Sequence, residues 1–186
     1  MHQKRRVIIY VATSLDGYIA TAEGELNWLA LAEKANEDYG YSDFIKNIDT
    51  VIMGRKTYDK VRSFGIEFPH KDKQLIILTR QKFPPLENTT YYDGDLEKLI
   101  RELKSQPGKN IYVDGGTDVI HQMMISNLVD EFIITVVPIL LGHGMPLFMD
   151  HRPEMQIRHI STKTFDTGVV QSHYKRIACK TTLIAS

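Results

Sequence analysis

The sequence predicts an α/β fold with a mostly parallel central sheet and an antiparallel hairpin near its C-terminal end. Strand-like apolar runs alternate with helix-like stretches through the first two-thirds of the chain. Two further β-prone runs, residues 156–165 and 169–179, then flank a turn at residues 166–168. Alternation of strands and helices is typical of a parallel sheet covered by helices, and paired runs around a glycine-containing turn are typical of a hairpin.

Length and charge limit the class of protein further. The 186 residues suit one domain with a sizeable core, so we expect residues 1–186 to form a single domain. Lys+Arg and Asp+Glu both number 23, which argues against a nucleic-acid or membrane-surface partner. No apolar run has the length of a membrane span or of a signal peptide. The single cysteine, Cys179, cannot form an intrachain disulfide, so we expect a reducing, cytoplasmic setting.

The first third of the chain contains two expected strands. Residues 7–12 are apolar and rich in β-branched side chains, like a strand buried on both faces. Residues 28–48 favour helix, with a possible break at Gly40, because apolar residues recur there at helical spacing. Residues 50–53 form the second strand, and a helix that runs to about residue 62 follows Gly54.

The rest of the chain continues the alternation. The further elements that we expect are strands at 74–78, 91–92 and 110–114, helices at 96–104 and from 117 to about 128, and a strand at 132–141. Asp95 has the position and side chain of an N-cap. Pro138 interrupts the last strand, which indicates an edge, a bulge or the end of that strand.

Four strand ends carry residues suited to a ligand, and they lie at positions 12–17, 54–57, 79–80 and 115–117. In open parallel sheets, ligands bind at the carboxyl ends of the strands. Gly115 and Gly116 precede a helix, whose N-terminal N–H groups favour phosphate, although such glycines can also serve a left-handed turn alone. Arg55 and Lys56 oppose the dipole of the helix that they begin, which an anionic ligand would explain. Together the four ends predict a nucleotide crevice.

Four segments resemble the dihydrofolate reductase-like superfamily, and are most similar to the C-terminal reductase domain of the bifunctional riboflavin-biosynthesis protein. These segments are Val11-Ala12-Thr13-Ser14-Leu15-Asp16-Gly17-Tyr18-Ile19-Ala20, Val51-Ile52-Met53-Gly54-Arg55-Lys56-Thr57-Tyr58, Val113-Asp114-Gly115-Gly116 and residues 138–148. The resemblance covers nearly the whole chain, with the motifs in matching order. It implies a three-layer α/β/α fold and NADPH as the cofactor.

The resemblance also assigns cofactor contacts by position. It places the nicotinamide beside Ala12, Gly17, Tyr18 and Ile19, the phosphates and adenosine half beside Gly54, Arg55, Lys56 and Thr57, the 2′-phosphate beside Thr79 and Arg80, and the pyrophosphate beside Gly115, Gly116 and Thr117. Asp114 belongs to the same motif, because the riboflavin branch commonly has Glu before its two glycines. An anion beside a phosphate is unexpected, so we expect the Asp114 side chain to face away and hold the neighbouring loop.

Reduction of a C=N bond also needs a proton, which one carboxyl group in an apolar pocket usually helps to deliver. In dihydrofolate reductases this acid lies on the first helix. Alignment back from Gly54 without a gap points to Asp38, with Glu37 beside it. Counting forward from Trp28 points instead to Glu33. All three remain candidates for the catalytic acid. Asp16, which the motif places near the nicotinamide, is a further candidate, although its neighbour Gly17 favours a plain turn role.

The resemblance therefore implies an NADPH-dependent oxidoreductase of a small heterocyclic or imine substrate, similar to 5-amino-6-(5-phosphoribosylamino)uracil reductase. The alternatives are a dihydrofolate or pteridine reductase and a non-catalytic NADP-binding regulatory protein. Tyr18 stands where the riboflavin branch typically has Lys, and Leu26-Asn27-Trp28 stands where dihydrofolate reductases have Met-Pro-Trp, so the substrate stays open. No histidine pair has the spacing of metal ligands, so we expect no metal site. Residues 132–141 are too apolar for a lone edge strand, which predicts a homodimer that buries them.

Overall fold

The computed structural model describes residues 4–177, which form ten strands, four α-helices and one 3₁₀-helix. The strands are β1 (Val7–Ser14), β2 (Tyr18–Ala20), β3 (Ile48–Gly54), β4 (Gln74–Leu78), β5 (Thr89–Tyr92), β6 (Asn110–Gly115), β7 (Glu131–Val137), β8 (Met145–Pro146), β9 (Ile157–Thr164) and β10 (Val170–Arg176). The helices are the 3₁₀-helix η1 (Asn27–Ala32), α1 (Tyr41–Lys46), α2 (Arg55–Ser63), α3 (Leu96–Ser105) and α4 (Thr117–Ile125).

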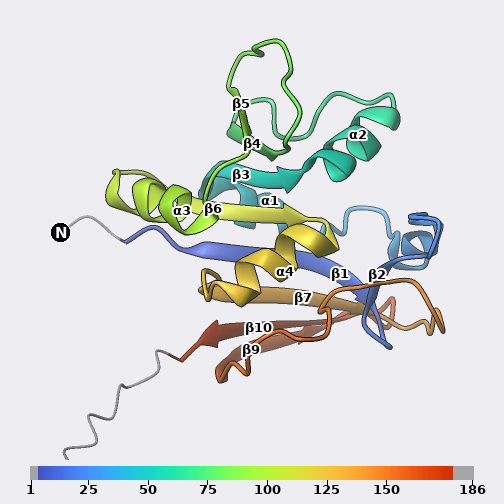
Figure 1. Cartoon of the computed structure of the whole chain (residues 1–186). Helices are drawn as coiled ribbons and strands as arrows, with labels where there is room; N and C mark the ends of the chain where they lie inside the picture. Colours follow the sequence, from blue (N-terminus) through green and yellow to red (C-terminus); the bar gives the residue numbers. More distant parts are fainter. Residues whose placement is uncertain (1–3, 178–186) are drawn as a thin grey trace, which may run out of the picture.

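Eight of these strands form one sheet in the order β5-β4-β3-β6-β1-β7-β10-β9 (Figure 1). The strands from β5 to β7 all pair in parallel. β10 pairs antiparallel with both β7 and β9. The predicted parallel sheet with a C-terminal antiparallel hairpin is therefore confirmed. Cys179, which the sequence placed at the end of this hairpin, lies outside the described residues.

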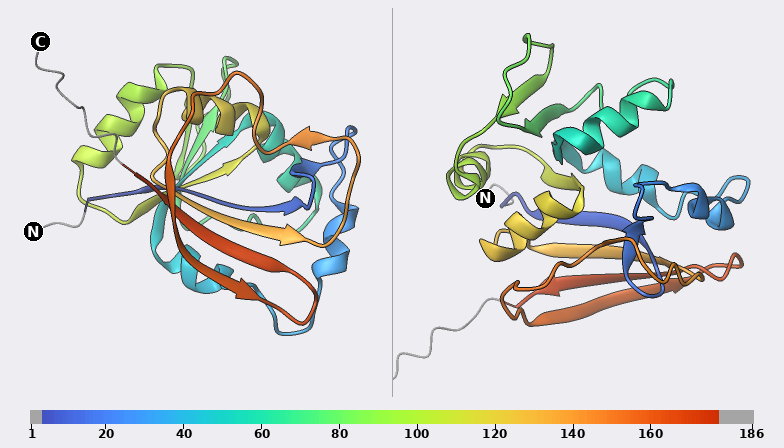
Figure 2. Two further views of the ribbon diagram at one scale, coloured as in Figure 1. Left: turned by 90° about the horizontal axis from the view of Figure 1, so that it is seen from below. Right: turned by 45° about the vertical axis from the view of Figure 1, so that its right-hand side comes forward.

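Helices cover both faces of the sheet, as the three-layer prediction requires (Figures 1 and 2). α3 and α4 bury their apolar stripes, including Ile100 and Met123, against Ile52 and Val113 on one face. On the other face, α1 and part of α2 pack on Met53 and its neighbours. The two cores follow from the strand pleat, which sends successive side chains to opposite faces. Within residues 4–177, no helix combines the length and apolar character needed to cross a membrane.

Residues 28–48 do not form one helix, contrary to the sequence prediction. η1 ends at Ala32, and α1 begins only after Gly40, which has a φ of 85°. Asn36 and Tyr39 also have positive φ angles, of 63° and 56°. A right-handed helix cannot contain such residues, so residues 33–40 form a loop. The predicted break at Gly40 is confirmed, whereas the helical continuation before it is wrong.

β7 is an inner strand, which corrects the argument for dimerisation. β7 ends at Val137, so Pro138 marks the end of the strand. β1 and β10 pair with its two sides, and β9 is the edge strand at this end of the sheet. The apolar character of β7 therefore follows from burial within the chain and gives no reason for a second copy. The homodimer remains a prediction without this support.

The predicted N-cap of α3 is confirmed. The Asp95 carboxylate accepts hydrogen bonds from the backbone N–H groups of Glu97 at 2.7 Å and Lys98 at 3.2 Å. These two donors belong to the first turn, where the helix offers them no backbone acceptor.

We expect Asp95→Ala to lower the free energy of unfolding by about 1 kcal/mol, because both donors lose their acceptor. Urea denaturation followed by circular dichroism measures this change. Asp93→Ala, at a nearby exposed position, is the matched control and should change the value by less than about 0.5 kcal/mol. Equal stability of the two variants would contradict the capping role.

Candidate functional site

The structure brings the four predicted strand ends to one edge of the sheet. β1, β6, β3 and β4 are neighbours in the sheet and pair in parallel, so their carboxyl ends share one side. The segments that follow these strands contain most of the predicted cofactor-binding residues. Parallel pairing over these strands is what converts four separate sequence signals into one candidate site.

The starts of α2 and α4 meet at this edge. Gly54 is the N-cap of α2 and Gly116 is the N-cap of α4, and no side chain caps either helix. A Cβ atom on Gly54 would lie only 3.9 Å from the carbonyl oxygen of Gly115 and 4.0 Å from the nitrogen of Gly116. Two helix N-termini with uncapped N–H groups therefore lie side by side, which favours an anionic group.

Polar side chains around this junction also lack protein partners. The Thr117 hydroxyl is buried and makes no hydrogen bond with the described residues. A Cβ atom on Gly116 would lie 3.2 Å from the Thr57 hydroxyl oxygen, so glycine keeps the space between the two helix starts open. An orphaned hydroxyl beside an open cradle of N–H groups suits a phosphate-bearing cofactor.

Arg55 links this junction to the segment after β4. Its guanidinium forms an ion pair with Asp59 at 2.7 Å and lies 3.8 Å from the centre of the Phe83 ring. Its Nη1 atom is buried without a partner among the described residues. Thr79 and Arg80 lie in the same segment as Phe83, and Arg80 is exposed, as is Lys56. Cations thus gather beside the helix starts, where a phosphate chain could extend.

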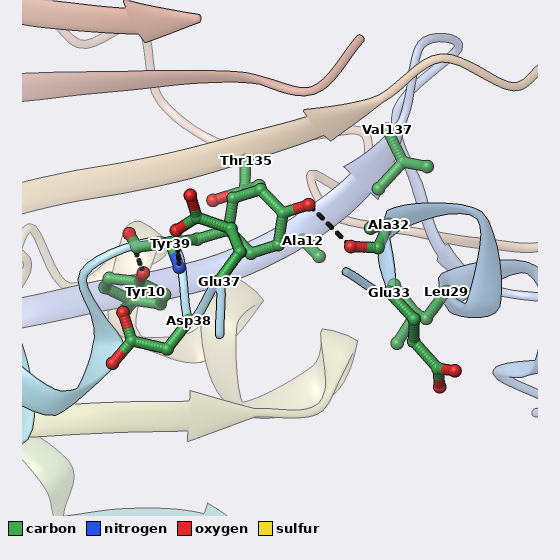
Figure 3. A pocket seen from close by; sticks show the side chains of 10 residues that line it. All are labelled: Tyr10, Ala12, Leu29, Ala32, Glu33, Glu37, Asp38, Tyr39, Thr135 and Val137. Atoms are coloured by element: carbon green, nitrogen blue, oxygen red, sulfur yellow. Dashed lines mark hydrogen bonds between the residues drawn. The ribbon is translucent and has the colours of Figure 1, made fainter. Parts of the chain in front are cut away.

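A separate cavity of about 260 Å³ opens on the α1 side of the sheet (Figure 3). Its described lining consists of Tyr10, Ala12, Leu29, Ala32, Glu33, Glu37, Asp38, Tyr39, Thr135 and Val137. The floor comes from alternate residues of two paired strands, with Ala12 of β1 opposite Thr135 of β7. η1 and the 33–40 loop form the walls. Sequence reasoning placed Ala12 and the three carboxylates at a site, but missed the rest of this lining.

The three candidate acids all line this cavity, but they differ in orientation. Asp38 caps α1, accepting from the N–H groups of Gly40 at 2.8 Å and Ser42 at 2.9 Å. Hydrogen bonds from Ser42, and then from Gly40, hold the pKa of Asp38 below its ordinary value. Asp38 is therefore ionised near neutral pH and is poorly suited to hold a proton for donation. It also precedes α1, which corrects its predicted place within the first helix.

Glu33 and Glu37 occupy different parts of the 33–40 loop. Glu33 is exposed at the end of η1, and Figure 3 shows its side chain leading away from the strands of the floor. Glu37 is half-buried, and its Oε1 atom accepts from the N–H of Tyr39 at 2.8 Å. Figure 3 shows the Glu37 carboxylate directed toward the floor. Of the three candidates, Glu37 is the one held over the cavity.

Tyr39 fastens the loop to the sheet. Its carbonyl oxygen accepts from the Tyr10 hydroxyl at 2.9 Å and from Gln171 Nε2 at 3.0 Å. Its own hydroxyl donates to the Ala32 carbonyl at 2.5 Å and lies 2.9 Å from the Thr167 hydroxyl. Tyr10 could have been found from the sequence, since it lies two residues before Ala12 and shares its face of β1. Nothing in the sequence around Tyr39 indicated that it would contact the sheet.

The predicted nicotinamide contacts do not share one cavity. Ala12 lines the cavity described above, whereas Gly17 and Tyr18 line a second cavity of about 340 Å³ with Phe148 and its neighbours. Ile19 packs against the core beside α4. Thr13 and Val136 also line the second cavity, and they neighbour Ala12 and Thr135 along their strands, so the two cavities lie on opposite faces of the sheet.

Asp16 fixes that turn. Its carboxylate accepts from the Ser14 hydroxyl at 2.6 Å and from the N–H groups of Leu141 at 3.1 Å and Gly142 at 2.7 Å. The hydrogen bond from Ser14 contributes most to holding the pKa of Asp16 below its ordinary value. Asp16 thus joins the β1–β2 turn to the segment after β7.

Asp114 takes part in a different network from the glycines that follow it. Its carboxylate accepts from the Tyr112 hydroxyl at 2.5 Å, and its Oδ2 atom lies 3.3 Å from His70 Nε2. His70 is only 2% exposed and belongs to the segment between α2 and β4. The Asp114 side chain therefore holds a neighbouring loop, as expected from the sequence. The sequence contained no signal for His70 as its partner.

Comparison with known proteins identifies the class. Residues 5–171 match the model of the RibD C-terminal domain family. The chain is 38% identical to the uncharacterized protein YwjB of Bacillus subtilis (strain 168) over 93% of this chain and 99% of that protein. The chain therefore belongs to the RibD C-terminal domain family.

Two solved structures place the fold. A Shewanella sp. PV-4 protein named "Putative riboflavin biosynthesis protein" superposes with a TM-score of 0.84 at 32% identity, covering 92% of this chain and 99% of that one. Dihydrofolate reductase from Enterococcus faecalis, complexed with NADP(H), superposes with a TM-score of 0.65 at 16% identity, covering 95% and 99%. The fold is therefore dihydrofolate reductase-like.

The cap formed by Asp38 should make the stability of the 33–40 loop depend on pH. The folded-state pKa lies below the ordinary value of 3.8, so the charged form stabilises the fold. This contribution is complete above pH 3.8 and is lost as the pH falls through the lower folded-state pKa. We expect Asp38→Asn to have a lower free energy of unfolding than the native protein at pH 7. The difference between the two should shrink below pH 4.

Urea denaturation across this pH range measures the margin, with Asp93→Asn as the control for loss of an exposed carboxylate. A margin that stays constant as the pH falls would contradict the role of the Asp38 charge.

Proposed function

We propose that this protein is an NADPH-dependent oxidoreductase that reduces a small heterocyclic or imine substrate, in the manner of a pyrimidine reductase. One observation carries the proposal: two uncapped helix N-termini meet at Gly54 and Gly116, on the same sheet edge as a cavity with an inward-facing carboxylate. The first feature suits the phosphates of a dinucleotide, and the second suits proton delivery. Membership of the RibD C-terminal domain family supports the same reaction class.

The residues for the cofactor follow from this arrangement. The helix starts at Arg55 and Thr117 would receive the pyrophosphate, and Arg80 would pair with the 2′-phosphate, since a guanidinium fork matches phosphate oxygens. The complex of the Enterococcus faecalis neighbour with NADP(H) supports a dinucleotide on this fold. When bound, NADPH supplies a hydride, and the protein's own groups orient the substrate and manage the proton.

Glu37 is the candidate residue for delivering the proton that the reduction consumes. Reduction of a C=N bond adds a hydride to carbon and a proton to nitrogen, so each turnover consumes one NADPH and one proton. The Glu37 carboxyl group is held above the cavity floor by the N–H of Tyr39. It would pass a proton from solvent at the loop to the nitrogen of the bound substrate.

A second candidate function is a non-catalytic NADP-binding protein. The exposure of Glu33 and the capping role of Asp38 favour it, because both withdraw a predicted acid from the cavity. Hydride transfer separates the two functions: NADPH that binds but is never oxidised by any pyrimidine or pteridine substrate would favour the non-catalytic protein.

We expect Arg80→Ala to weaken NADPH binding about ten- to hundredfold and to leave NADH binding nearly unchanged, because only NADPH carries the 2′-phosphate. Titration followed by nicotinamide fluorescence gives both dissociation constants. Arg101→Ala, an exposed arginine on α3, is the matched control. Equal losses for NADPH and NADH would contradict the assignment of Arg80.

We expect Glu37→Gln to lower kcat by about 10²- to 10⁴-fold while NADPH binding is retained, because the amide cannot supply a proton. Steady-state oxidation of NADPH at 340 nm, with a pyrimidine substrate, measures the loss. Glu33→Gln should reduce kcat far less. If Glu33→Gln proved the more damaging variant, the proton would take a route through the end of η1 instead.

A further inference from the structure

Among residues 4–177, the charged residues that line the cavity beneath the 33–40 loop are all acidic. Its described lining includes Glu33, Glu37 and Asp38, but no lysine, arginine or histidine. Lys34, which lies between these acids in the chain, is held instead by Asp166 at the tip of the β9–β10 hairpin, at 2.8 Å. Lys34 still lies near enough for Glu37 to add to the rise in the Lys34 pKa that Asp166 mainly causes. Among the described residues, the lining itself therefore contains acids but no base.

The floor of the cavity provides a directed donor. Thr135 is 5% exposed, and its hydroxyl oxygen accepts from Gln171 Nε2 at 2.9 Å. The same amide nitrogen also lies within hydrogen-bond distance of the Tyr10 hydroxyl and the Tyr39 carbonyl, so its two hydrogens are shared among three acceptors. The Thr135 hydroxyl carries a proton of its own, and its one hydrogen bond among the described residues is the contact with Gln171 Nε2, which is a donor. This hydroxyl is therefore available to donate to a ligand or to water in the cavity.

Glu37 provides the complementary acceptor. Its Oε1 atom is engaged by Tyr39, while Oε2 makes no hydrogen bond with the described residues. The remaining lining is apolar or small, including Ala12, Leu29 and Val137. A flat ring with an N–H or amino group for Glu37 and a carbonyl or ring nitrogen for Thr135 would satisfy both groups.

A phosphate ester does not fit these surroundings. At pH 7 it carries a charge of about −1.5 to −2. In this cavity that charge would lie beside the Glu37 carboxylate, with Glu33 and Asp38 at the rim and no cation in the described lining to compensate it. The cations at the start of α2 and after β4, namely Arg55, Lys56 and Arg80, belong to the proposed cofactor site, where the phosphates of NADPH would occupy them.

We propose that the cavity selects an unphosphorylated, uncharged or protonated amino-substituted ring, and discriminates against the phosphate ester of the same ring. This inference rests on the proposed function in treating the cavity as the substrate site. It differs from that proposal in naming the charge class of the substrate, which the reaction type leaves open.

Trp28 offers a reporter that does not require turnover. It is the only tryptophan of the chain and is 7% exposed. It packs with Val137 and Ala12, both of which line the cavity. Ligands that enter the cavity should therefore change its fluorescence.

The test is a titration of the full chain with 5-amino-6-(ribosylamino)uracil and, separately, with its 5′-phosphate. We expect the unphosphorylated compound to bind at least about tenfold more tightly, and this preference to narrow as salt rises and screens the carboxylates. Equal or tighter binding of the phosphate, or no fluorescence change with either compound at millimolar concentration, would overturn the inference.

A matched pair of variants tests whether the acidic lining causes the preference for the unphosphorylated compound. Glu33→Lys should reduce the preference at least about threefold, because it places a cation at the cavity. Glu102→Lys makes the same charge change at an exposed position of α3, on the opposite face of the sheet, and should leave the preference unaltered. An equal effect of both variants would show that the cavity charge does not select the ligand.

NADPH oxidation with the two compounds keeps the two proposals separate. If the phosphate binds better and is reduced, the inference fails while the proposed function stands. If the unphosphorylated ring binds better but no compound oxidises NADPH, the proposed function fails while the charge selection stands.

Discussion

The candidate site depends on the parallel pairing of β3, β6 and β1. The register sets Met53 opposite Gly115, so α2 and α4 start from adjacent points on the same sheet edge. Gly54 and Gly116 make this approach possible, since a side chain at either position would crowd its neighbours across the junction. One backbone arrangement thus places two positive helix ends together, and Arg55 adds a cation at the same edge, an arrangement that favours an anionic ligand.

The cavity beneath the 33–40 loop depends on a second, longer-range constraint. The 33–40 loop has almost no secondary structure of its own, and it is held by hydrogen bonds from Tyr10 and Gln171 to the Tyr39 carbonyl. These donors come from β1 and β10, which are far apart in sequence but separated by only β7 in the sheet. The hairpin near the C-terminal end therefore shapes the cavity wall, in addition to completing the sheet.

Most strands and helices could be predicted because their signals are local. The apolar runs of β1, β3 and β4 lie within a residue or two of their expected positions, and the N-cap of α3 was correct. The helix expected across residues 33–40 failed because Tyr39 adopts a positive φ that its side chain does not favour locally. Contacts with Ala32, Thr167 and Gln171 offset that preference, and none of them is visible in the local pattern.

The sequence by itself determined the order of the elements, the strand ends rich in glycine and cations, and three carboxylates as candidates. These follow from backbone preferences and from the spacing of apolar residues, which act over a few positions. Only the tertiary structure decided that Asp38 is a helix cap, that Glu37 faces the cavity, and that Thr135 and Tyr10 form its floor. Those roles depend on strand register and on contacts between distant segments, because the direction of a side chain is set by the surfaces that pack around it.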